Sequence, residues 1–232
     1  MVQGAGGKDP EACQDCLLNR NIVDISGRYI ILATRQSEES MKKNIGVVNG
    51  LYPSLTTIIG AVVQGKPNFL TIAHVGILNH GIPQYLSFGI NKAHYTNQGI
   101  IEHKEFSVNI PSEALVVETD YMGLVSGKNS DKSAVFDLHY GSLAHAPLIV
   151  SCPVVMECRL QSTLDFSSHD IFIGEIVATH VDPDVLTPEG KIDLTLVKPL
   201  LFDMQGMRYL ALGPEVAKCW NVGKAMKKTG KS

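Results

Sequence analysis

From residue 56 onward, the chain alternates short β-branched and aromatic runs with turn residues, a pattern typical of antiparallel strands. Gln64-Gly65-Lys66-Pro67 lies between the first two runs, and its glycine and proline predict a hairpin with Asn68 at its exit. The runs that predict strands are Thr56–Val63, Phe69–Val75, Gln84–Ile90, Phe106–Ile110, Val154–Leu164, Ile171–Val181 and Ile192–Val197.

Helical patterns are short and few. We expect helices over Tyr95–Lys104, capped by Thr96 or Asn97, over Ser112–Thr119, and over Glu215–Lys228 near the C-terminus. Many short strands with few helices favour a mainly β fold, an antiparallel barrel rather than a parallel α/β sheet.

The first forty residues differ in composition from the rest of the chain. They combine a glycine-rich start with Cys13 and Cys16 and a polar stretch before Met41. We interpret residues 1–40 as an N-terminal extension and residues 41–232 as one domain. Met41 could equally be the natural start, an alternative that mass spectrometry of the native protein would decide.

Composition and charge exclude several classes of function. The 232 residues are 44% hydrophobic and 19% charged with a net charge of -3, and no block of like charges offers a nucleic-acid footprint apart from a lysine cluster at the end. Apolar runs such as Thr57–Val63 fall short of the ~20 residues that cross a membrane. The N-terminus lacks the pattern of a secretory signal, and five cysteines make an odd number, so we expect a cytoplasmic protein with reduced cysteines.

Several catalytic and binding motifs fail on spacing. No Gly-x-Gly-x-x-Gly follows a strand, and Gly123–Gly127 lacks the central serine of a nucleophile elbow. Gly230-Lys231-Ser232 resembles the end of a P-loop, but Ala225 stands where that motif needs its first glycine. Cys13 and Cys16 have no second pair to complete a zinc site, and the eight histidines show no metal-ligand spacing. We therefore expect no metal.

Seven segments, in order, carry a resemblance to a known family. They are Leu51-Tyr52-Pro53, Gly65–Ala73, Asn91–Thr96, Phe106–Ser112, Asp120–Gly123, Ser126–Lys132 and Ile173–Ile176. Over residues 42–228 the chain resembles the flavin reductase-like FMN-binding proteins, in particular the flavoredoxin group. The resemblance implies an antiparallel split β-barrel that forms homodimers and binds FMN non-covalently near the subunit interface.

The phosphate of FMN needs backbone N–H groups at a helix start, hydroxyls and a cation. Lys92 and Thr96, before and at the start of a predicted helix, supply that set. Without the resemblance, the same residues also fit a surface lysine and a helix cap.

The isoalloxazine ring needs an apolar slot with a few donors and acceptors along one edge. Asn68, Thr71 and the backbone around Ala73 can provide them, although the residues alone also fit a turn asparagine and a strand threonine. The family often has an aromatic residue where this chain has His74, which can still stack on the ring.

The resemblance also implies residues that act on the reduced cofactor. Ser126 and Lys132 belong to a loop that the resemblance places over the flavin, so both are expected to bind the cofactor. Lys132 matches the lysine of that loop, where a cation would stabilise the anionic reduced ring. His169 matches a histidine at the open side of the ring, although Ser167-Ser168 replace the family's Gly-Asp. Phe202 is the aromatic residue expected to approach the cofactor.

These expectations combine into an oxidoreductase that passes hydride or electrons through FMN, with His169 and Lys132 as its catalytic residues. Two electron donors stay open: NAD(P)H, as in a flavin reductase, or a redox protein partner, as in a flavoredoxin-type carrier. A third alternative is a barrel without cofactor that serves as a scaffold.

Overall fold

The computed structural model describes residues 22–23, 29–30 and 42–227. These residues fall into two units, divided between Val48 and Asn49, which are described separately. In the first unit, β1 (Ile22–Val23) pairs antiparallel with β2 (Tyr29–Ile30). Cys13, Cys16 and Met41, which the sequence singled out, lie outside the described residues.

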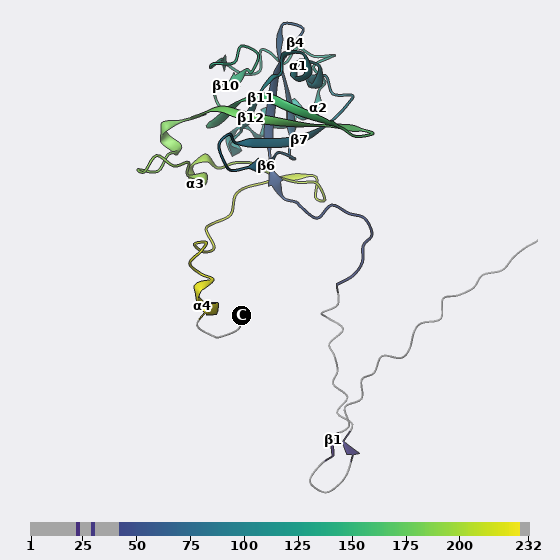
Figure 1. Ribbon diagram of the computed structural model, residues 1–232, viewed down its shortest axis with the longest axis vertical. Helices are drawn as coiled ribbons and strands as arrows, with labels where there is room; N and C mark the ends of the chain where they lie inside the picture. The colour runs from purple at the N-terminus through teal and green to yellow at the C-terminus, as the bar shows by residue number, and fades with distance from the viewer. Residues whose placement is uncertain (1–21, 24–28, 31–41, 228–232) are drawn as a thin grey trace, which may run out of the picture. The chain divides into compact units, whose positions relative to one another are not determined.

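The second unit is built on one seven-stranded antiparallel sheet (Figure 1), which confirms the predicted antiparallel β fold. Its strands, in spatial order, are β5 (Lys66–Ile72), β4 (Thr57–Val63), β8 (Glu105–Ile110), β11 (Val154–Asp165), β12 (His169–Val181), β7 (Tyr85–Asn91) and β6 (Gly76–Asn79).

The strand order requires the sheet to curl. β5 and β6 stand at its two opposite edges, yet only residues 73–75 connect them. Three residues span at most ~11 Å, so the two edges approach each other at this connection. The β4–β5 hairpin turns through Gln64 and Gly65, both at positive φ (50° and 75°), as a two-residue turn of the I′ type needs.

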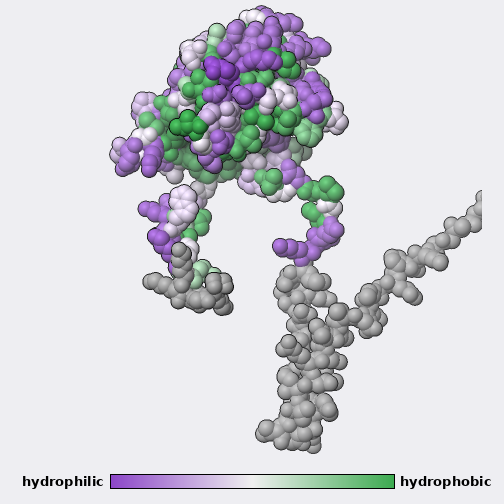
Figure 2. Space-filling model, in the orientation of Figure 1, coloured by the Kyte–Doolittle hydropathy of each residue, from purple (hydrophilic) through white to green (hydrophobic). Residues whose placement is uncertain are grey.

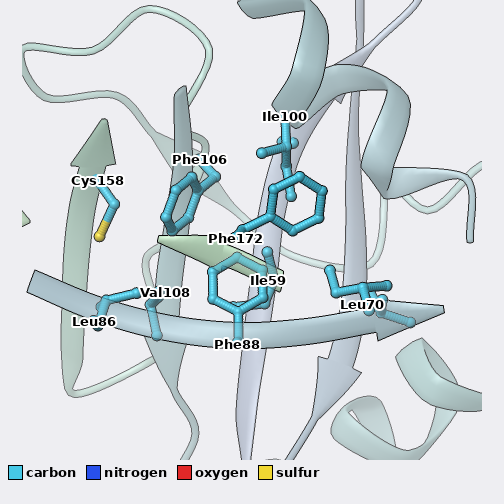
Figure 3. Close-up of a cluster of buried hydrophobic side chains, with 11 residues drawn as sticks. Ile59, Leu70, Leu86, Phe88, Ile100, Phe106, Val108, Cys158 and Phe172 are labelled. Carbon is cyan, nitrogen blue, oxygen red and sulfur yellow. The ribbon is translucent and has the colours of Figure 1, made fainter. Parts of the chain in front are cut away.

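Alternate residues of the curled sheet face a common core, which Figure 3 shows with Phe88, Phe106 and Phe172 at its centre. Helix α1 (Thr96–His103) contributes Ile100 to this core. A second core on the other face of β4 and β5 contains Met122 of α2 (Val116–Leu124), Cys152 and residues of β10 (Leu148–Ile149), which pairs with β9 (Leu138–His139). Every residue of β4 is buried because the strand packs on both faces.

Smaller elements complete the second unit. A three-stranded sheet has the order β14 (Arg208–Leu210), β13 (Leu201–Asp203), β3 (Ser54–Leu55). The remaining elements are η2 (Glu113–Leu115), η3 (Pro183–Val185), α3 (Leu194–Val197) and α4 (Lys224–Lys227). Hydrophobic and hydrophilic residues are interspersed over the face shown in Figure 2. Within the described ranges, no helix has the length and apolar character of a membrane span.

Three predictions of local structure were wrong. Ile192–Val197 does not form a strand: Asp193 caps a helical turn by accepting a hydrogen bond from the Thr195 N–H at 2.9 Å, and this cap overrides the β-branched composition. Neither Thr96 nor Asn97 caps α1, because Thr96 accepts a hydrogen bond from Asn68 and Asn97 donates one to the Asn91 carbonyl.

The third concerns the C-terminus, where the predicted helix over Glu215–Lys228 is reduced to Lys224–Lys227 within the described residues. The predicted helix over Ser112–Thr119 exists, but it begins with the single turn of η2 and continues as α2 to Leu124.

Candidate functional site

A cavity of about 330 Å³, here called the histidine pocket, opens where the β5–β6 connection meets β7, β12 and the small sheet. Its volume lies within the ~300–1,000 Å³ usual for small-molecule sites. The lining includes three histidines, His74, His94 and His169, together with Thr71, Ala73, Gly89, Asn91, Asp120, Phe202 and Tyr209. The curling of the sheet therefore creates the pocket, because it brings the ends of β5, β7 and β12 together.

His74 is held by Tyr52, which precedes β3. The Tyr52 hydroxyl and His74 Nε2 share a hydrogen bond of 2.8 Å, and the Tyr52 ring meets Phe202 edge to face at 6.2 Å between centroids. Burial, and then the neighbouring His169, lowers the pKa of His74. Tyr52 thus fixes two walls of the pocket without lining it.

His169 and His94 complete the imidazole group. Ser168 Oγ lies 2.9 Å from His169 Nδ1, so the serine that replaces the family's aspartate still provides a polar partner for this ring. The pKa of His94 is lowered by burial, and then by the charges of Lys132 and His169. The lowered pKa values favour the neutral imidazole for both His74 and His94.

Two other residues that line the histidine pocket form hydrogen bonds to α2. Thr71 donates its hydroxyl proton to the Thr119 carbonyl of α2, and the Tyr209 hydroxyl donates to Asp120 Oδ1 at 3.1 Å. Burial and the Asp120 carboxylate together raise the pKa of Tyr209 to about 12. Thr71 therefore has its proton engaged, while its oxygen remains able to accept a hydrogen bond.

A second cavity of about 330 Å³, here called the lysine pocket, adjoins the first: His94 lines one and Tyr95 the other. Lys132 lines it with only 3% of its surface exposed, and Nζ donates to the Phe69 and Met122 carbonyls, both at 2.8 Å. Burial lowers the pKa of Lys132 to about 8. Among the described residues, no carboxylate forms an ion pair with this ammonium.

The neighbouring Asp131 does not neutralise Lys132. Its carboxylate accepts hydrogen bonds from Lys66 Nζ at 2.8 Å and from the Ser133 hydroxyl at 2.6 Å. These bonds hold the pKa of Asp131 well below its usual range. Asp131 therefore shapes the loop and leaves the charge of Lys132 uncompensated.

Asn68 lies in the wall between β5 and α1. Its side chain is 4% exposed, and Nδ2 donates to Thr96 Oγ1 at 2.8 Å. Gly127 packs directly against it: a Cβ at residue 127 would lie 1.8 Å from Asn68 Oδ1. Only glycine fits there while Asn68 keeps its position.

The structure brings together most of the residues predicted to bind the cofactor. Thr71, Ala73, His74, His169 and Phe202 line the histidine pocket. Asn68 and Lys132 line the lysine pocket, and Thr96 contacts Asn68.

Two predicted residues lie apart from both pockets. Lys92 forms ion pairs with Asp165 and, at 3.7 Å, with Asp170, and its side chain is 40% exposed. The exposed Ser126 caps its own loop, since Ser126 Oγ accepts the Lys128 N–H at 3.3 Å.

Sequence reasoning missed three participants. All three, Tyr52, His94 and Asp120, stand in the segments that carry the resemblance but received no role there. His94 follows Lys92 by two residues, so its position near a predicted phosphate site was a usable signal. The pairing of Tyr52 with His74 joins positions 22 residues apart, which no local pattern reveals.

Comparison with known proteins identifies the family. The model of the "Flavin reductase like domain" matches residues 49–211. The chain belongs to the flavin reductase-like family. Its predicted relationship to this family, including the flavoredoxin group, is confirmed. A flavoredoxin from Methanosarcina acetivorans is 38% identical with a TM-score of 0.76, covering 80% of this chain and all of the other.

Two further solved structures agree. Flavoredoxin of Desulfovibrio vulgaris is 33% identical with a TM-score of 0.73, covering 79% of this chain and all of the other. A "putative flavin reductase with split barrel domain" from Shewanella frigidimarina is 17% identical with a TM-score of 0.62, covering 71% of this chain and 84% of the other. The predicted split β-barrel is thus confirmed, and family membership supports a flavin-binding redox function.

Proposed function

We propose that this protein binds FMN non-covalently, with the isoalloxazine ring in the histidine pocket, and passes electrons through it. The observation that carries the proposal is Lys132, an ammonium with 3% of its surface exposed, which has two carbonyl acceptors and, in the part of the chain that the structure describes, no carboxylate partner. A buried charge is costly unless it is paired. A ligand with electronegative atoms beside Nζ would supply the missing partner for its third proton.

The two pockets offer contacts for different parts of the flavin ring. The histidine pocket offers imidazole and aromatic walls for a flat ring, with the Thr71 oxygen as an acceptor beside it. It is open space rather than a groove filled by the chain's own side chains, which argues against the scaffold alternative. Asn68 presents Oδ1 beside Gly127, where an amide can orient a ring edge.

The phosphate is proposed to lie near Lys92 and the start of α1. In that arrangement Lys92, which is 40% exposed, exchanges Asp165 for the phosphate. Thr96 is already engaged by Asn68, so its contribution would come through its backbone N–H or its remaining hydroxyl capacity.

The bound flavin would supply the hydride and single-electron chemistry. The protein's own residues bind, orient and tune. Lys132 would hold a positive charge near the bound flavin, and such a charge would favour the reduced state of the cofactor. His169, held by Ser168, stands at the pocket wall where a donor would approach. Tyr52 keeps His74 and Phe202 in place around the ring.

We further propose a homodimer, because flavin sites in this fold are expected at a subunit interface. The donor is either NAD(P)H or a protein partner. Anaerobic stopped-flow reduction with NADH, NADPH and a low-potential protein donor separates the two. Rapid reduction by a nicotinamide supports a flavin reductase. Reduction by the protein donor alone supports a flavoredoxin-type carrier.

Binding itself is tested by titrating the flavin-free protein with FMN and measuring flavin fluorescence. We expect saturable quenching at one FMN per chain. The Lys132→Met variant should bind more weakly, with Lys128→Met, a lysine of the same pocket, as matched control. No quenching by the unmodified protein would refute the proposal.

A further inference from the structure

The segment after β14, residues 211–225, leaves apolar side chains in water. It is here called the C-terminal arm, and every one of its residues is exposed. Val216 is 98% exposed and Trp220 is 92% exposed. Trp220 also has φ at 54°, a left-handed conformation that is a genuine outlier for a bulky residue. A strained tryptophan in water indicates a segment without its packing partner.

A groove of matching character lies along α2. It measures about 530 Å³ and is here called the α2 groove. Val117, Leu124 and Met207 leave 74%, 75% and 82% of their surface exposed in it. Its apolar and aromatic lining consists of Val116, Val117, Tyr121, Leu124, Met207 and Tyr209.

Charge indicates which apolar segment would occupy the α2 groove. Residues 113–124, which form η2 and α2, hold Glu113, Glu118 and Asp120 but no lysine or arginine. The arm holds Lys218, Lys224 and Glu215, and three more lysines follow it at positions 227, 228 and 231. An arm seated in the groove would therefore bring basic residues beside an acidic helix, which favours this pairing over one without charge complementarity.

We propose that the C-terminal arm of one copy docks in the α2 groove of a second copy, with Trp220 as its anchor. The arm is exposed throughout relative to its own unit, so the second copy supplies the occupant. In a symmetric pair each contact occurs twice. A buried tryptophan contributes roughly 150–250 Å² and each aliphatic side chain somewhat less, so two arms with their grooves would bury on the order of 2,000 Å². This area meets the ~1,200–2,000 Å² of stable interfaces.

The docked arm would also border the cofactor site. Asp120, Leu124 and Tyr209 line both the α2 groove and the histidine pocket. The partner's arm therefore covers one side of the pocket mouth and limits access of water and of large donors. This consequence rests on the proposed function and on the homodimer, whereas docking itself is testable without flavin.

Trp220 is the only tryptophan in the chain, so its fluorescence reports the arm directly. The experiment measures the emission maximum and acrylamide quenching of the flavin-free, full-length protein, together with sedimentation velocity. We expect a dimer whose tryptophan emission is blue-shifted and protected from quenching. Val117→Lys should expose the tryptophan. Val150→Lys, at an exposed valine outside the groove, should leave it buried.

A mixing experiment separates docking between copies from docking within one copy. Val117→Lys has a defective groove and an intact arm, whereas Trp220→Ala has an intact groove and no tryptophan. When the two are mixed, the only tryptophan present belongs to the Val117→Lys chain. A blue shift on mixing supports the proposal. Two results would overturn it. One is an exposed Trp220 in the unmodified dimer. The other is a Trp220 that is buried in the unmodified protein but stays exposed when the two variants are mixed.

Discussion

Lys132 makes FMN binding depend on protons in a predictable way. Burial lowers its pKa from 10.5 to about 8, so at pH 8 about half of the free protein carries a neutral amine at this position. Two of the three ammonium protons go to the Phe69 and Met122 carbonyls. A flavin edge that accepts the third proton favours the charged form and raises the pKa.

The magnitude follows from the titration. A rise of about one pKa unit takes the protonated fraction at pH 8 from about one-half to about nine-tenths, so each FMN bound takes up about 0.4 proton. At pH 6 the lysine is already charged in the free protein, and its contribution falls to nearly zero. The sign is fixed: the proton moves from solvent to protein on binding.

The same lowered pKa affects folding. Because the folded pKa lies below the unfolded value, the unfolded chain binds more protons between pH 8 and 10.5, and the stability of the free protein rises with pH in that window. The full difference corresponds to about 3 kcal/mol. Bound FMN, which raises the folded pKa by about one unit, should remove about 1.4 kcal/mol of this difference.

Isothermal titration calorimetry in buffers of different ionisation enthalpy measures the proton uptake at pH 6 and pH 8. Riboflavin serves as the comparison ligand, since it lacks the titrating phosphate. The Lys132→Met variant should lose the uptake at pH 8, and Lys128→Met should keep it. Equal uptake at both pH values, or uptake that survives Lys132→Met, would refute the role given to this lysine.

Three further predictions test other parts of the molecule. Lys92→Ala should weaken the binding of FMN about tenfold more than the binding of riboflavin, because only FMN carries the phosphate. If Lys128→Ala, and not Lys92→Ala, weakens FMN selectively, the phosphate lies in the lysine pocket instead. Gly127→Ala should weaken the binding of FMN and of riboflavin by the same factor, because the new Cβ displaces Asn68. Unchanged binding of both would contradict the packing of Gly127 against Asn68. The buried Glu157 of β11 accepts the Leu143 N–H at 2.6 Å and lies 2.8 Å from His180 Nε2, so Glu157→Gln should lower the free energy of unfolding in urea by about 1–3 kcal/mol near pH 7. Burial raises the pKa of Glu157, but its hydrogen bonds outweigh burial and lower the pKa, so the difference in stability should shrink as acid protonates the native carboxylate. Equal stability of the two proteins at pH 7 would show that this carboxylate does not stabilise the fold.

Much of the fold could be predicted because it follows from local patterns. The strands that form the sheet carry β-branched residues at regular intervals, and the Gln64-Gly65 turn has the glycine that its positive φ favours. The predicted strand over Ile192–Val197 was wrong because one capping residue, Asp193, outweighed the β-branched residues around it. The strand order, with β5 and β6 at opposite edges, depends on contacts that no short segment encodes.

The candidate site shows the same division. Residues grouped along β5 and its exit, such as Thr71 and His74, were found together because neighbours in sequence remain neighbours in space. Lys92 was assigned from its spacing to α1, but its partners Asp165 and Asp170 lie on strands more than seventy residues away. The uncompensated charge of Lys132 also required the structure, since sequence placed Asp131 beside it while the fold directs that carboxylate to Lys66.

The most direct test of the central claim is the visible absorption spectrum of the protein after incubation with FMN and removal of unbound ligand. We predict a retained, spectrally shifted flavin at one FMN per chain, reduced by at least one physiological donor class. A colourless protein that neither retains FMN nor alters its spectrum would contradict the assignment of the histidine pocket as a flavin site.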